Sequence, residues 1–125
     1  MTTVVDPLGT PTPIYNRSGT TIVAVSANGS DGTTATVVPV ESGVTLVLCT
    51  LSSGNSDVMV PPDMEIGTVI EAYNVSDTSS SQSLHFYCAS GELINGYLAY
   101  KGISGQSGCR FTKTDASTWR SVGIV

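Results

Sequence analysis

Three β-prone segments between Pro61 and Gly123 decide the fold class of this chain. They are PPDMEIGTVIEAYNV (residues 61–75), LHFYCASGELINGYLAY (residues 84–100) and SGCRFTKTDASTWRSVG (residues 107–123). Aromatic and β-branched residues fill the apolar runs, because these side chains suit a pleated, half-buried surface. Gly, Asn, Asp and Ser fill the gaps, because they tolerate turn dihedral angles. No segment repeats apolar residues at helical spacing, so the chain is predicted to be all-β.

The same cadence of short strands and turns continues toward the N-terminus. Strands are expected there at residues 20–27, 34–40, 44–51 and 58–60. The segment 44–51 is almost continuously apolar, which predicts a strand buried on both faces. At the other end of the chain, residues 109–113 and 118–122 are expected to form a closing hairpin around Asp115-Ala116-Ser117. In total the pattern predicts about nine strands, as in an antiparallel sandwich, a jelly roll or a small barrel. One helical turn is predicted at residues 62–65, because proline favours a first helical position.

The length of 125 residues predicts one domain. We assign it to residues 15–125 and expect an extended N-terminal arm at residues 1–14. Pro7, Pro11 and Pro13 make a helix in this arm unfavourable, because proline fixes φ and removes a hydrogen-bond donor. Two interpretations of the arm stay open: a disordered chain end, or a segment that docks on a neighbouring subunit.

The composition argues against nucleic acid and membrane as partners. The net charge is −5, and the five Lys and Arg residues form no basic stripe of the kind that neutralises phosphates. No apolar run approaches the length of a membrane span, and the N-terminus lacks the basic and apolar regions of a secretory signal. Charged residues make up only 12% of the chain, about half the usual share, which suits a surface that packs against other protein.

The three cysteines, Cys49, Cys88 and Cys109, are too widely spaced to predict a zinc site. An odd number leaves at least one thiol free in a monomer. We interpret them as small buried apolar residues of a protein folded in a reducing compartment. A bridge between Cys88 and Cys109 on neighbouring strands stays open.

No catalytic constellation is apparent, so the sequence predicts a protein that is not an enzyme and uses no metal or cofactor. The one histidine, His85, lies in mid-strand without a partner at a meaningful spacing, and a general base needs such a partner. Ser104 and Ser107 lie in GISGQSG, which breaks the nucleophile-elbow pattern because Gln106 interrupts it. Asp63 and Glu65 are only two carboxylates of a calcium loop.

Aromatic residues offer an alternative function. Tyr87, Tyr97, Tyr100 and Trp119 have apolar bodies and polar tips, which suit a surface that stacks on sugar rings. Glycan contacts are therefore expected at Tyr97, Tyr100 and Trp119 if the domain is a carbohydrate-binding β-sandwich.

The second half of the chain resembles a pattern found in small β-proteins of tailed bacteriophages. The matching parts are Gly67-Thr68-Val69 through Asn74, then Ile94-Asn95-Gly96, then Gly108 with Phe111, and finally Trp119. The resemblance covers about half of the chain, and its residues belong to turns and to the core. With its size, its acidity and its proline-bearing arm, the chain is similar to the capsid decoration (cement) proteins of these phages.

This resemblance implies a non-enzymatic virion protein on the outer capsid surface, made in the host cytoplasm. Such a protein would be a homotrimer whose partner is the major capsid protein, and it would stabilise the capsid by clamping neighbouring coat subunits. The expected capsid contacts lie in the arm: Val4, Val5, Pro7, Leu8, Pro11, Pro13 and Ile14. A fibre or tail accessory protein is the other virion role that the same pattern allows.

Overall fold

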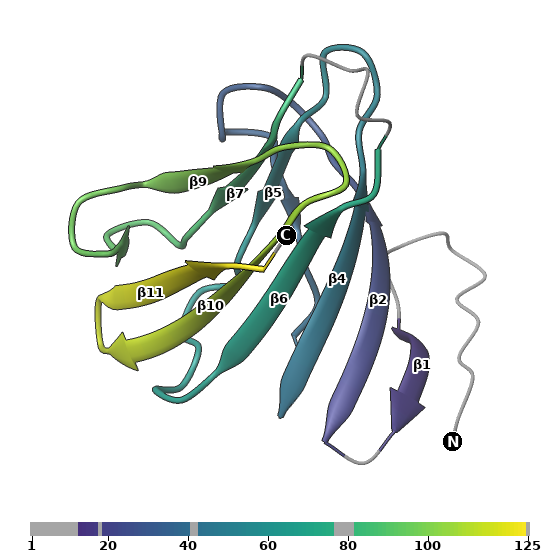
Figure 1. Ribbon diagram of the computed structural model, residues 1–125. Coiled ribbons are helices and arrows are strands. Elements are labelled where there is room, and N and C mark those ends of the chain that lie inside the picture. Colours follow the sequence, from purple (N-terminus) through teal and green to yellow (C-terminus); the bar gives the residue numbers. More distant parts are fainter. Residues whose placement is uncertain (1–12, 18, 41–42, 77–81, 125) are drawn as a thin grey trace.

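The computed structural model describes residues 13–17, 19–40, 43–76 and 82–124, and shows an all-β protein with two sheets and no helix in these ranges (Figure 1). The strands are β1 (Pro13–Arg17), β2 (Thr20–Ser26), β3 (Thr36–Val37), β4 (Val44–Thr50), β5 (Asp57–Met59), β6 (Val69–Asn74), β7 (Leu84–Tyr87), β8 (Leu93–Ile94), β9 (Tyr100–Ile103), β10 (Gly108–Asp115) and β11 (Thr118–Gly123). Sheet A has the order β1-β2-β4-β6-β10-β11-β8, and sheet B has the order β3-β5-β7-β9. The prediction of an all-β fold is confirmed.

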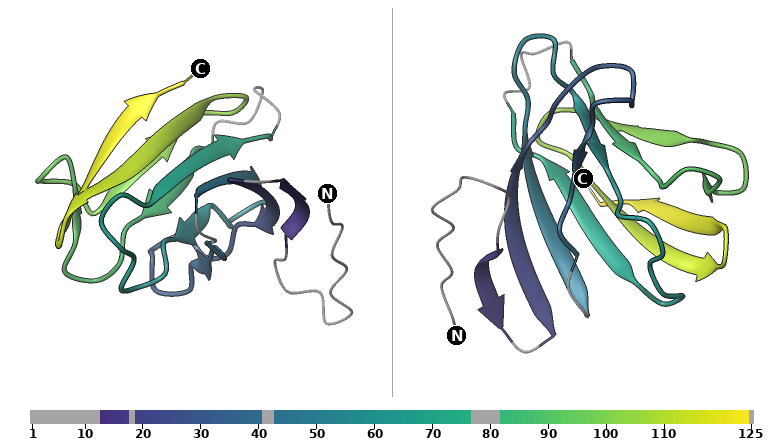
Figure 2. Two further views of the ribbon diagram at one scale, coloured as in Figure 1. Left: turned by 90° about the horizontal axis from the view of Figure 1, so that it is seen from below. Right: turned by 180° about the vertical axis from the view of Figure 1, so that it is seen from behind.

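From β2 to β7 the chain forms three coils of a short solenoid-like arrangement. Strands β2, β4 and β6 are parallel neighbours in sheet A. Strands β3, β5 and β7 are parallel neighbours in sheet B. The chain therefore alternates between the sheets, and each coil stacks on the previous one (Figures 1 and 2).

Inward-facing side chains of the coils form rows that run across the strands. Val23 pairs in register with Val47, and Val47 with Ala72. All three are fully buried, as are Val58 and Phe86 from sheet B. Small β-branched residues suit this place, because each lies directly above the equivalent residue of the next coil.

A glycine in the left-handed region precedes each sheet-A strand of the coils. Gly19, Gly43 and Gly67 have φ of 80°, 90° and 96°, and Gly91, another 24 residues on, has φ of 85°. The Gly19 carbonyl accepts a hydrogen bond from the Val44 amide at 2.9 Å. A Cβ on Gly43 would lie 2.6 Å from that same oxygen, so the coils stack closely only if this corner has no side chain.

The C-terminal third closes the stack with antiparallel strands. Strand β10 pairs antiparallel with β6 and with β11, whereas β11 pairs in parallel with the two-residue strand β8. In sheet B, β9 pairs antiparallel with β7. The rings of Phe86 and Phe111 stack between the sheets with centroids 4.4 Å apart, and Trp119 is buried.

The topology corrects several of the sequence predictions. The expectation of an antiparallel sandwich, jelly roll or barrel is wrong for the coils, because their strands pair in parallel. The predicted hairpin about residues 115–117 is confirmed as β10–β11. Strand β4 is not buried on both faces, since buried and half-buried side chains alternate along it. The predicted helical turn at 62–65 is wrong, because Asp63 has a φ of 63° and no helix forms there.

Most of the predicted arm, residues 1–12, lies outside the described residues. Its last two residues, Pro13 and Ile14, belong to β1, whose backbone pairs antiparallel with β2 at the edge of sheet A. The domain's own sheet therefore begins two residues earlier than we expected from the sequence.

Candidate functional site

A row of apolar and aromatic residues crosses the outer face of sheet B. Val37 pairs in register with Met59, Met59 with Tyr87, and Tyr87 with Tyr100, so one residue comes from each strand of the sheet. Val37 is 49% exposed and Tyr100 is 42% exposed, whereas Met59 and Tyr87 are half-buried. We call these four residues the sheet-B row.

His85 joins the two tyrosines of the row in a cluster of three rings. The centroids of Tyr87 and Tyr100 are 4.9 Å apart, and those of His85 and Tyr100 are 4.8 Å apart. The ring of His85 lies edge-on to Tyr87 at 6.4 Å. These spacings are typical of favourable aromatic pairs, so the rings support one another as a fixed surface.

A fully buried carboxylate on the neighbouring strand, that of Asp57, orients the histidine. Asp57 Oδ1 lies 3.1 Å from His85 Nδ1 and accepts a hydrogen bond from Ser56 Oγ at 2.9 Å. Asp57 Oδ2 accepts a hydrogen bond from the Gly32 amide at 2.6 Å. Since a carboxylate accepts, His85 Nδ1 donates to Asp57, which leaves Nε2 for another hydrogen-bond partner. In the part of the chain that the structure describes, Nε2 has no hydrogen-bond partner.

The loop between β2 and β3 borders the ring cluster. A Cβ on Gly32 would lie 2.8 Å from the ring of Tyr87, so the backbone packs directly against that ring. Next to it, Asp31 Oδ1 accepts hydrogen bonds from the side chain and the amide of Thr33. These bonds lower the pKa of Asp31, with the side-chain bond contributing most. Asp31 is therefore an ionised, oriented carboxylate at the rim.

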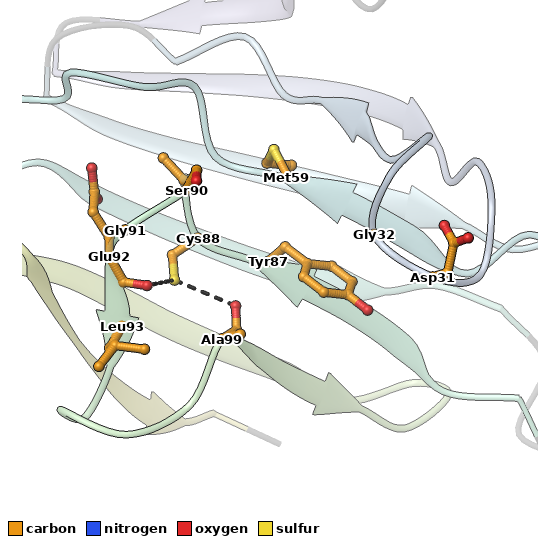
Figure 3. Close-up of a pocket in the computed structure, with 11 residues that line it drawn as sticks. Asp31, Gly32, Met59, Tyr87, Cys88, Ser90, Gly91, Glu92, Leu93 and Ala99 are labelled. Atoms are coloured by element: carbon orange, nitrogen blue, oxygen red, sulfur yellow. Dashed lines mark hydrogen bonds between the residues drawn. The ribbon is translucent and has the colours of Figure 1, made fainter.

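A cavity of about 520 Å³ continues from Tyr87 to the segment that follows β7 (Figure 3). Cys88 lies in its wall and donates to the carbonyls of Glu92 and Ala99. Burial raises the pKa of the Cys88 thiol, which makes it a poor nucleophile. The charged residues lining the cavity are Asp31 and Glu92, both acidic.

The Ser56–His85–Asp57 cluster is not arranged as a nucleophilic triad. In such a triad the serine and the carboxylate contact different nitrogens of the histidine. Here Ser56 Oγ lies 3.5 Å from Nδ1, the nitrogen that Asp57 already contacts, and Ser56 donates to Asp57. Nor do the described residues bring together three metal-ligating side chains. The arrangement is suited to binding through rings, a carboxylate and an imidazole.

The outer face of sheet A is the second candidate surface. Ile22, Leu46 and Leu48 are half-buried on β2 and β4, and Ala24 is exposed beside them. Figure 1 views the molecule from this side, and no described strand crosses in front of β2, β4 and β6. We call these four residues the sheet-A face.

A polar network borders the sheet-A face on β6 and β10. Tyr73 donates a hydrogen bond to Glu71 at 2.8 Å, and Arg110 donates to the other Glu71 oxygen through two nitrogens. The hydrogen bond to Glu71 is the largest cause of a raised pKa at Tyr73. A cavity of about 250 Å³ lies between Leu48 and Tyr73, so the border is hollowed rather than flat.

The structure separates the residues that the sequence proposed as glycan contacts. Trp119 is 1% exposed and its Nε1 donates to Glu92, so its prediction as a sugar contact is wrong. Tyr97 is 72% exposed but shares no ring contact with the cluster. Tyr100 belongs to the sheet-B row. Among the predicted capsid contacts, Val4, Val5, Pro7, Leu8 and Pro11 lie outside the described residues.

Asp57 and Asp31 were missed by the sequence analysis, and His85 was interpreted as structural. Asp57 lies 28 positions from His85, and the two meet only because β5 and β7 are parallel neighbours in register. No local motif signals such a pair. The alternation in LHFYC does place His85 and Tyr87 on one face, which was the available signal.

The comparisons with known proteins found no relative. No family model matches the chain, and neither a curated protein nor a solved structure is significantly similar to it. Among the described residues, none forms a helix with the length and hydrophobicity that a membrane crossing requires. The proposals below therefore depend on the geometry of this chain and on the resemblance of its second half to small β-proteins of tailed bacteriophages.

Proposed function

We propose that this chain is a non-enzymatic structural protein of a bacteriophage virion. It binds the outer surface of the assembled capsid and stabilises it by clamping neighbouring major capsid protein subunits. The observation that carries the proposal is the sheet-A face, an apolar surface on the central strands of the larger sheet. Contiguous apolar surface of this kind marks protein–protein contact sites.

The composition of the surface supports this role. Only 12% of the residues are charged, and charged residues are depleted at the centres of protein interfaces. The polar network of Glu71, Tyr73 and Arg110 at the border supplies the tyrosine and arginine that such interfaces favour. A partner that binds the assembled shell and not the free coat subunit stabilises the shell by mass action.

The proposal includes a homotrimer. Three copies that engage three sites on the shell at once gain avidity without any new type of contact. The proposal includes a second contact through residues 1–12, which we expect from their prolines to be extended. In this contact the main chain of the arm pairs with an exposed sheet edge of a coat subunit.

The test is co-sedimentation with capsids of the encoding phage that were assembled without this chain. Wild-type protein should bind, and Leu48→Lys should lose binding by about a hundredfold, because it places a charge in the apolar contact. The control is Val37→Lys, which adds the same charge on sheet B at a side chain that is 49% exposed.

A second variant, lacking residues 2–12 but keeping β1, tests the arm separately. Weaker capsid binding with an unchanged melting temperature supports an arm contact. Wild-type protein that fails to bind the capsids, or Leu48→Lys that binds as tightly as Val37→Lys, overturns the proposal for the sheet-A face.

A further inference from the structure

We propose that the sheet-B row and His85 form a binding site for a neutral pyranose sugar. The site lies on the opposite sheet from the proposed capsid contact and does not depend on that proposal. Its parts are the rings of Tyr87 and Tyr100, the imidazole of His85 and the carboxylate of Asp31 (Figure 3 shows Asp31 and Tyr87 at one end of the cavity).

The shape and exposure of the aromatic surface suit a pyranose ring. A pyranose has an apolar C–H face and a rim of hydroxyl groups, so it binds where an open ring lies beside polar groups. Tyr100 is 42% exposed and is held by contacts with both His85 and Tyr87, at 4.8 Å and 4.9 Å. A ring fixed in this way loses little conformational entropy on binding.

The orientation of His85 suits a hydrogen bond to a sugar hydroxyl group. Asp57 has no exposed surface and is already bonded by Ser56 and Gly32, so it holds the imidazole through Nδ1. A carboxylate is expensive to bury unless it is paired and hydrogen-bonded. This support leaves Nε2, on a side chain that is 29% exposed, to form a hydrogen bond with a sugar hydroxyl, which can donate or accept.

The negative charge beside the rings determines which class of sugar can bind. Asp31 presents one oxygen to solvent, since Thr33 bonds to the other. A free carboxylate oxygen accepts hydrogen bonds from hydroxyl groups. Glu92 in the cavity wall is paired with Lys113 and adds no free charge. No Lys or Arg lines the cavity, so nothing there offsets the charge of Asp31, which repels a sugar that carries a carboxylate. The site therefore favours neutral hexopyranosides over uronic or sialic acids.

The experiment is a screen of the full chain against immobilised neutral gluco-, manno- and galacto-oligosaccharides, with polygalacturonate and sialylated oligosaccharides as the acidic arm. We expect binding to one or more neutral glycans and none to the acidic arm. Binding confined to the acidic arm, or no binding to any neutral glycan, overturns the proposal.

Affinity for the selected glycan is then measured by NMR titration of variants. Tyr100→Ala should weaken binding at least about tenfold, as loss of an aromatic anchor does, whereas Tyr100→Phe should keep most of it. Asp31→Asn should also weaken binding, because it replaces a charged acceptor. The matched control is Tyr97→Ala, which removes a tyrosine that is 72% exposed and lies outside the row.

Two further readouts keep this result distinct from a loss of fold and from the capsid proposal. Tyr100→Ala should leave the melting temperature and capsid binding unchanged, and Leu48→Lys should leave glycan binding unchanged. A Tyr100→Ala protein that binds the glycan as tightly as wild type, or a Tyr97→Ala protein that alone loses it, shows that the sugar binds elsewhere.

Discussion

The three coils and the C-terminal strands fill the same two-sheet core with different side chains. In sheet A the coils use small residues in rows, such as Val23, Val47 and Ala72. The C-terminal part uses Phe111 and Trp119, both buried. The difference follows from strand numbers: after β7, sheet A gains β8, β10 and β11, whereas sheet B gains only β9.

Three added strands, of which β8 has only two residues, widen sheet A by about 14 Å, since neighbouring strands lie about 4.8 Å apart. Sheet B widens by about a third as much, so large side chains fill the space between the sheets at this end. The same region holds a buried cation. Lys113, with a 4% exposed side chain, lies 3.4 Å from Glu92 and 5.9 Å from the centroid of the Trp119 ring. Small residues repeated from coil to coil therefore fill the core on the sheet-A side of the coils, whereas single large side chains fill it in the C-terminal part.

Core substitutions in the two regions should have the largest effect on the free energy of unfolding, and they test this contrast. Trp119→Ala should lower the free energy of unfolding by about 3–5 kcal/mol, because it removes a large buried ring and leaves a cavity. Val47→Ala should cost only about 2 kcal/mol, as the removal of two buried carbon groups predicts. Chemical denaturation of both variants measures the difference. Equal losses would contradict the idea that single large contacts dominate the C-terminal part.

The corner glycines offer a test of intermediate size. Gly43→Ala should destabilise the protein by about 2–3 kcal/mol, because it combines a left-handed φ with a Cβ 2.6 Å from the Gly19 carbonyl. Gly91→Ala is the matched control, since its φ of 85° is similar but no atom lies within 4 Å of the new Cβ. It should cost only about 1–2 kcal/mol. Thermal unfolding measures the stability of the two variants. A larger loss of stability for Gly91→Ala would show that coil stacking does not require a glycine at position 43.

The smallest effect concerns two buried thiols, one from each region. Burial raises the pKa of Cys49 to about 12 from an ordinary value of 9.0. Burial also raises the pKa of Cys109, but the charge of Lys101 and hydrogen bonds from the neighbouring strand oppose the rise. Between pH 9 and 12 the unfolded chain releases the Cys49 proton while the folded chain keeps it. Folding stability should therefore fall with rising pH, by about 1.4 kcal/mol per pH unit from this group.

The measurement is the pH dependence of the urea midpoint above pH 9 for wild type, Cys49→Ala and Cys109→Ala. Removing Cys49 should flatten the curve more than removing Cys109 does. Below pH 9 the three curves should run parallel, because both thiols are then protonated in the folded and the unfolded state. A steeper curve for Cys49→Ala would have the wrong sign and would contradict burial as the cause.

Much of the strand pattern was predictable, but the pairing was not. The strand ending at Ser26, the one beginning at Val44 and the hairpin about residues 115–117 follow from alternation and turn residues. Alternation has the same period of two in parallel and antiparallel sheets, so it cannot distinguish them. The available signal for parallel coils was the glycine at positions 19, 43, 67 and 91. We missed it because glycine is common at every turn and the loops between the strands differ in length.

The candidate sites divide in the same way. The sequence placed Tyr100 among possible sugar contacts, but it also placed Trp119 there. Both residues lie in β-prone runs, and only the packing of β11 between β10 and β8 buries the second one.

The sequence by itself determined that this protein is all-β, acidic and poor in charge, because composition and side-chain period are local properties. Only the tertiary structure decided that the strands stack as coils, that Asp57 meets His85, and that apolar side chains gather on the outer face of β2 and β4. These features depend on register between residues about 24 to 28 positions apart, and hydrogen bonds across that separation leave no trace in local sequence.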